Sequence, residues 1–201
     1  MDSLLCHTGQ HIAGQHEKSA HQACKKLFRA LAADGALHAR FLNTLSLMEH
    51  IGSRKIMASQ PPDSEVLQHL AEETRHALFF KRLAQRRAGR ALAYSNEELV
   101  AGPGARAYLQ RLNGVVARRA SGRAAYLLKS LAIELRATWF YRLYESALEP
   151  RLTGILAEEQ KHLAGMQKAL AELPAPPDLD AILAEEEKLF TRLMAALLSP
   201  L

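Results

Sequence analysis

The sequence predicts an all-α fold: a four-helix bundle of two antiparallel hairpins joined by a long crossover, with an additional C-terminal helix. Three observations predict it. Ala, Leu, Glu, Arg and Lys dominate the 201 residues, and all are good helix formers. No segment alternates apolar and polar residues as a half-buried strand does. Prolines and glycines divide the chain into helix-sized segments in the order hairpin, crossover, hairpin.

The first hairpin is expected to begin with one long helix over residues 20–58. Pro61 and the proline after it end this helix, because the residue before a proline is forced out of the helical region. Asp63 or the serine after it can cap a second helix, which ends near Gly89. Residues 89–104 then contain two turn sequences and are expected to form the long connection.

The second hairpin is expected to begin with a helical region over residues 105–148. Glycines at Gly114 and Gly122 mark two places where it can be interrupted. A fourth helix follows Pro150. A fifth, over residues 178–198, is amphipathic and is expected to pack outside the bundle.

One helical domain is expected over residues 21–201, behind a flexible tail over residues 1–20. The tail contains His7, His11 and His16. Histidine-rich tracts can bind metal, but spacings of this kind at a chain end are more typical of a tail.

The two cysteines form no Cys-x-x-Cys pattern, which favours a reducing, cytoplasmic location. No apolar stretch has the ~18 residues of a membrane span, and the start has no signal-peptide core. The net charge of +5 predicts a surface that can attract an anionic substrate, an acidic carrier protein or nucleic acid. A small-molecule substrate and an electron-donor protein are further expected partners. No motif supports nucleic acid, and a solvated helix face is the plainer interpretation.

A short sequence occurs twice. Residues 70–76 read Leu-Ala-Glu-Glu-Thr-Arg-His, and residues 156–162 read Leu-Ala-Glu-Glu-Gln-Lys-His. Residues 183–186 repeat the Leu-Ala-Glu-Glu part without a histidine, so that part is weak evidence in a chain of this composition. The informative part is Glu-x-x-His.

Glu73 with His76, and Glu159 with His162, are these two pairs. A spacing of three places both side chains on one helix face. A carboxylate and an imidazole there offer the oxygen and nitrogen ligands that iron, manganese or zinc accept. Two such pairs, each in the second helix of a hairpin, predict a metal site.

Each hairpin also has a carboxylate in its first helix. Glu49 and Glu134 lie among apolar residues, where an ionised carboxylate is costly unless it is paired or binds metal. Their separation matches the offset of the repeat to within one residue. Glu134 leaves an axial mismatch of about 6 Å with Glu159, but the other candidate, Glu145, lies too close to the turn.

The pattern resembles that of the ferritin-like di-iron carboxylate superfamily. The resemblance implies a ferritin-like bundle and two iron ions, with manganese or zinc as other occupants, and Glu73 and Glu159 as bridging ligands. The second Glu-x-x-His is unlike storage ferritins, and no Cys-x-x-Cys module of a rubrerythrin is present. The chain is more similar to the symmetric oxygenase branch, and weakly similar to the tRNA-modifying hydroxylase. The implied ligands are Glu49, Glu73, His76, Glu134, Glu159 and His162.

The expected function is an O₂-activating oxygenase or hydroxylase of an unidentified organic substrate. Thr138, one turn after Glu134, is where some monooxygenases of this pattern keep a threonine that handles protons. Tyr141 can relay an electron or simply pack. The alternatives are a peroxidase or ferroxidase, which needs no organic pocket, and a non-catalytic helical binding or scaffold protein. A tunnel of about 300 Å³ or more favours the oxygenase, and a narrow apolar site favours the peroxidase or ferroxidase. A homodimer is compatible with the sequence.

Overall fold

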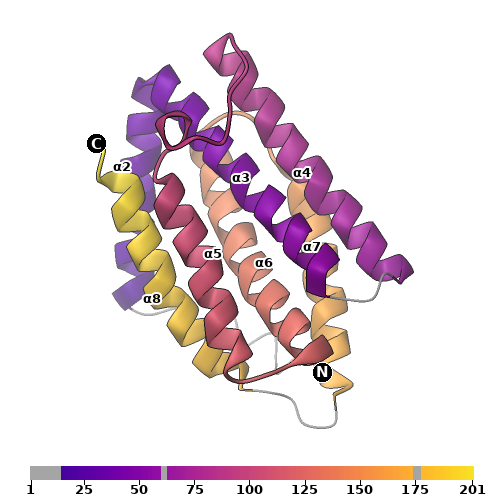
Figure 1. Cartoon of the computed structure of the whole chain (residues 1–201). Helices are drawn as coiled ribbons and strands as arrows, with labels where there is room; N and C mark the ends of the chain where they lie inside the picture. The colour runs from indigo at the N-terminus through magenta and orange to yellow at the C-terminus, as the bar shows by residue number, and fades with distance from the viewer. Residues whose placement is uncertain (1–14, 60–62, 174–177) are drawn as a thin grey trace.

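The computed structural model describes residues 15–59, 63–173 and 178–201, whose regular structure is entirely helical, without a strand (Figure 1). The all-α prediction is therefore confirmed. The residues Pro61, His7 and His11 lie outside these ranges. The helices are α2 (Gln15–Ala33), α3 (Gly35–Ser59), α4 (Ser64–Ala88), the 3₁₀ helix η1 (Asn96–Glu98), α5 (Gly102–Ala117), α6 (Gly122–Ala147), α7 (Thr153–Ala171) and α8 (Leu179–Leu198).

Two helices occupy the stretch that was expected to form a single helix over residues 20–58. The chain leaves the helix at Asp34, whose Oδ1 accepts hydrogen bonds from the backbone nitrogens of Ala36 (2.8 Å) and Leu37 (3.0 Å). A carboxylate in this position caps a helix N-terminus, so α3 begins anew there. The preceding helix α2 packs against α3 and α8. It already includes residues 15–20, so this part of the expected tail is helical.

The helices α3 and α4 pack against each other along most of their length and form the first hairpin. Asp63 caps α4, since its Oδ1 accepts a hydrogen bond of 2.8 Å from the Val66 nitrogen. Gly89 ends α4 in the left-handed conformation, with a φ of 67°, which glycine adopts without a steric cost. Both helix boundaries agree with the prediction.

The crossover between the hairpins is longer than expected, because it contains the complete helix α5. Of the two predicted interruptions, the one at Gly122 is correct, and Gly114 lies inside α5. Polar side chains of α3 fix the loop that precedes α5. The Asn43 amide donates to the carbonyl oxygens of Ala93 (2.7 Å) and Glu98 (2.8 Å).

The helices α3 and α6 lie in the middle of the described structure. On one side they pack against α4 and α7, and on the other side against α2, α5 and α8. Figure 1 shows α5 and α8 side by side on this second side. The C-terminal helix thus packs outside the group α3, α4, α6 and α7, as expected. None of the described helices combines the length and apolarity that crossing a membrane requires.

Candidate metal centre

All six residues that the sequence predicted as ligands meet in one cluster between α3, α4, α6 and α7. The helices α3 and α6 contribute one glutamate each, and α4 and α7 contribute one Glu-x-x-His pair each. Four of these side chains are buried and two are partly buried. The residues are Glu49, Glu134, Glu73 with His76, and Glu159 with His162.

The ligating atoms form two groups that share Glu73. Within each group, one oxygen or nitrogen atom of every member lies within 4.8 Å of the others. The first group is Glu49, Glu73 and His76, and the second is His69, Glu73, Glu134 and His162. Two groups around one shared carboxylate have the ligand types of a dinuclear site.

Glu159 also lies between the two groups. Its Oε1 is 3.1 Å from Nδ1 of His76, and its Oε2 is 3.4 Å from Nδ1 of His162. Glu159 is completely buried. A carboxylate with one oxygen directed at each histidine is placed as a bridging ligand would be.

Two further carboxylates fix the histidine rings from outside. Nε2 of His76 donates to Glu158 at 2.7 Å, and Nε2 of His162 donates to Glu72 at 2.5 Å. Each histidine is therefore bound by the glutamate that precedes the Glu-x-x-His of the opposite helix. Because Nε2 donates outward in these bonds, Nδ1 is the nitrogen that is directed inward, which is how ligating histidines are commonly oriented.

Several buried atoms of the cluster have no hydrogen-bond partner in the described structure. They are Oε1 of Glu73, Nδ1 of His76, Oε1 of Glu159 and Nε2 of His69. These atoms contact one another only as ion pairs, at 3.1 Å between His76 and Glu159 and 3.5 Å between His69 and Glu73, without the geometry of a hydrogen bond. A buried polar atom without a partner is unfavourable by about 1–3 kcal/mol. Since all four atoms are of the types that bind metal and lie in one cluster, the residues fit a pair of metal ions.

The cluster contains an excess of buried carboxylates, which shifts the pKa values of its members. Burial raises the pKa of Glu49 well above its ordinary value, and the charges of Glu73 and Glu159 raise it further. Burial and the charge of Glu159 do the same to the pKa of Glu134. Burial lowers the pKa of His76, but its contact with Glu159 and the charge of Glu49 outweigh this and raise it to about 9. The excess of buried carboxylates therefore favours the protonated forms of these three groups, and a cation bound among the carboxylates would offset the same repulsion.

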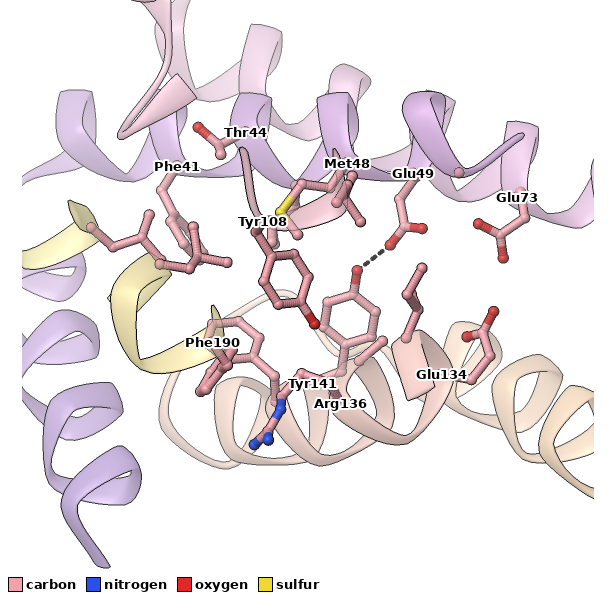
Figure 2. A pocket seen from close by; sticks show the side chains of 18 residues that line it. Phe41, Thr44, Met48, Glu49, Glu73, Tyr108, Glu134, Arg136, Tyr141 and Phe190 are labelled. Carbon is pink, nitrogen blue, oxygen red and sulfur yellow. Dashed lines mark hydrogen bonds between the residues drawn. The ribbon is translucent and has the colours of Figure 1, made fainter. Parts of the chain in front are cut away.

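The two residues proposed for catalysis differ in their contacts. Tyr141 donates a hydrogen bond to Glu49, as Figure 2 shows. Thr138 is buried, and its hydroxyl has no hydrogen-bond partner in the described structure. Gly52 of α3 makes room for the carboxylate of Glu73, because a Cβ there would lie 3.1 Å from Oε2 of Glu73.

An apolar cavity of about 80 Å³ lies beside the cluster, between α3, α5, α6 and α8. The carboxylates of Glu49, Glu73 and Glu134 reach its edge, as Figure 2 shows. The rest of its wall is mainly apolar, with Phe41, Met48 and Phe190 among the lining residues. Its volume is below the ~300 Å³ that is typical of a pocket for an organic substrate.

Scans of protein-family models, of curated proteins and of solved structures found no match to the chain.

Sequence reasoning missed three residues, namely His69, Glu72 and Glu158. The spacing of four between His69 and Glu73 places both on one face of α4, and this signal was overlooked. Glu145 was rightly excluded, because its Oε1 accepts hydrogen bonds from the backbone of Leu152 (2.7 Å) and the hydroxyl of Thr153 (3.0 Å), at the start of α7.

Proposed function

We propose that α3, α4, α6 and α7 are a ferritin-like bundle that holds two metal ions, and that the protein is an O₂-activating oxidoreductase. The observation that carries the proposal is the set of unpartnered buried atoms in the cluster. Two divalent cations would balance the four carboxylates Glu49, Glu73, Glu134 and Glu159, and would bind the inward-directed histidine nitrogens.

Iron is the proposed metal. Mixed carboxylate and imidazole ligation suits iron and also manganese or zinc, so ligand type alone does not decide. The absence of thiolates from the cluster removes the softer ligands that many structural zinc sites use. When bound, two ferrous ions supply electrons that reduce O₂. In an oxygenase the other two electrons of the four-electron reduction would come from the organic substrate, and an external donor would return two electrons to the irons.

The chain's own residues would position the ions and manage protons. Glu73 and Glu159 would serve both ions, Glu49 and His76 would hold one, and Glu134 and His162 would hold the other. Glu72 and Glu158 keep the two rings in the tautomer with Nδ1 inward. Tyr141 holds a proton at Glu49, because burial and the charge of Glu49 raise the pKa of its hydroxyl well above the ordinary value.

The small volume and the mainly apolar lining of the cavity restrict the size and the charge of a substrate. Its walls would exclude water and offer charged molecules no partner except the cluster and Arg136, which is already paired with Glu186. A substrate of the oxygenase is therefore small and apolar, or has a narrow apolar end that reaches the carboxylates of Glu49 and Glu134.

A second candidate is a peroxidase or ferroxidase that uses the same centre. The small volume of the cavity favours it, since peroxide or a ferrous ion needs no organic pocket. The protein ligands would have the same roles in both candidate functions. The two functions differ only in which molecule reaches the ions.

Isotope transfer distinguishes the two candidates. Metal-free protein is loaded anaerobically with ferrous iron, and then receives a reductant, ¹⁸O₂ and a small alkene as an apolar probe. An oxygenase places ¹⁸O in the alkene product, and a variant with Glu73→Ala and Glu159→Ala does not. Consumption of peroxide or ferrous iron without labelled product supports the second candidate. Failure of the wild-type protein to bind iron contradicts both.

A further inference from the structure

His69 is a third histidine at the cluster. It lies on α4 four residues before Glu73, and therefore on the same helix face. The residue is 6% exposed. Its ring lies beside that of His162, with 4.4 Å between the ring centroids. His69 thus belongs to the interior of the cluster, on the side of Glu134 and His162.

The inner nitrogen of His69 is unpartnered. Its Nε2 lies 3.5 Å from Oε1 of Glu73 and 3.5 Å from Oε1 of Glu134, too far for good hydrogen bonds. Accordingly, it is one of the buried atoms without a hydrogen-bond partner. A nitrogen between two carboxylates, at this distance from both, leaves space for an atom that all three contact.

The outer nitrogen of the same ring is fixed. Nδ1 of His69 and the hydroxyl of Tyr126 on α6 are 2.7 Å apart. With the proton on Nδ1, the tyrosine oxygen accepts it and Nε2 keeps its lone pair toward the cluster. This is the arrangement of a ligating histidine, whose second nitrogen binds an outer partner. The partner is a neutral hydroxyl here, whereas His76 and His162 bind carboxylates.

The second hairpin has no counterpart of His69. At the offset of 86 that relates the two Glu-x-x-His pairs, the matching position is Ile155, which is a buried apolar residue. The approximate symmetry of the six predicted ligands is therefore broken at one position.

We propose that His69 is a seventh protein ligand of the metal centre, and that it binds the ion held by Glu134 and His162. This inference rests on the proposed function. It makes the two metal positions unequal, because one receives two histidines and the other, beside Glu49 and His76, receives one. The position with fewer protein ligands is the one at which Tyr141 contacts Glu49.

The direct test is ¹⁵N NMR of histidine-labelled protein during titration with Zn²⁺, which is diamagnetic. Expected are shifts of Nε2 of His69 together with Nδ1 of His76 and His162. If the latter two shift and His69 does not, the inference is overturned and the metal centre remains. If none of the three shifts, the proposed metal centre is overturned together with the inference.

A calorimetric Zn²⁺ titration gives an independent readout. We expect His69→Gln to weaken one of two metal affinities by at least about tenfold and to leave the other within about twofold. His38→Gln is the matched control, because His38 is also buried and bonded to a tyrosine of α6, with Nε2 2.6 Å from the Tyr144 hydroxyl. Equal affinities in His69→Gln and the control overturn the inference. Should His69→Gln fail to fold, the NMR experiment on the wild-type protein still decides.

Discussion

Two buried polar clusters border the same cavity and satisfy their charges differently. One contains Glu134 and the other contains Arg136, two residues further along α6. Arg136 donates to both oxygens of Glu186, at 3.0 and 2.7 Å, and Tyr108 donates to the same carboxylate at 2.6 Å. Here one arginine pairs with the buried Glu186 and also with the partly buried Glu187. Glu134 instead lies in a cluster with three further glutamates, Glu49, Glu73 and Glu159. In the described structure the ion contacts of Glu73, Glu134 and Glu159 are with histidines.

The repeated Leu-Ala-Glu-Glu sequence contributes to both clusters, and in all three copies its second glutamate is buried. In two copies this residue is Glu73 or Glu159, which a histidine follows three residues later. In the third copy it is Glu186, and Arg136 neutralises it. The same local sequence therefore serves a protein-internal ion pair or a candidate metal centre. The two clusters differ in what the neighbouring helix supplies. Glu186 receives an arginine, whereas Glu73 and Glu159 each face the Glu-x-x-His pair of the opposite helix.

The largest expected effect is complete loss of metal binding when Glu73→Ala and Glu159→Ala are combined. In the wild-type protein, metal at about 100 times its Kd stabilises the fold by about 2.7 kcal/mol. At about 2–4 °C per kcal/mol for a chain of this size, the melting temperature rises by roughly 5–11 °C. We expect no rise in the double variant. Thermal denaturation with and without Zn²⁺ measures both, and an equal rise in the two proteins would show that the metal binds elsewhere.

The next largest effect is expected in the paired cluster. Arg136→Met leaves Glu186 buried without its partner, which lowers the free energy of unfolding by about 3–5 kcal/mol. Adding Glu186→Leu removes the stranded charge and should restore most of the loss. Urea denaturation of the metal-free proteins measures this. If the single and the double variant fold, their metal affinity should equal that of the wild-type protein. A large change in metal affinity would contradict the separation of the two clusters.

A smaller effect is expected from the outer carboxylates. Glu158→Gln removes the charge that binds Nε2 of His76 and should weaken metal affinity by about 10–100-fold. Glu185→Gln is the matched control, because Glu185 is the equivalent residue of the third copy, and it contacts Lys188 at the surface. Calorimetric Zn²⁺ titration compares the two. Equal affinities would mean that Glu158 does not orient the ring.

The smallest effect concerns His38, which lies away from both clusters. Burial and the charge of Arg87 lower its pKa from 6.5 to about 4. Between these values the unfolded chain binds a proton that the folded protein does not bind. Stability contributed by neutral His38 is therefore complete above pH 6.5 and decreases as the pH falls toward 4. The free energy of unfolding of His38→Gln should depend less steeply on pH in this window, and an identical slope would contradict the assignment.

Much of the candidate centre could be predicted from sequence, because its ligands follow helix periodicity. Glu73 and His76 share a face by their spacing alone, and Glu49 stands out as a charge among apolar residues. Glu72 and Glu158 could not be recognised in this way, because their partners are histidines of the opposite helix. Only the packing of α4 against α7 brings them together.

The fold was predictable to the level of helices and their ends. Gly89 and Asp63 mark ends by local chemistry, which sequence carries directly. The break at Asp34 was missed although the sequence carries a local signal for it, namely an N-cap residue followed by Gly35, a poor helix former. The position of α5 was missed because tertiary hydrogen bonds, such as those of Asn43, fix the preceding loop.

Metal stoichiometry tests the central claim most directly. Metal-free wild-type protein is dialysed anaerobically against ferrous iron, and the bound iron is measured beside the combined Glu73→Ala and Glu159→Ala variant. Two groups of ligands that share Glu73 predict about two iron ions per wild-type chain and none in the variant. A wild-type protein that retains no more iron than the variant would contradict the dinuclear centre.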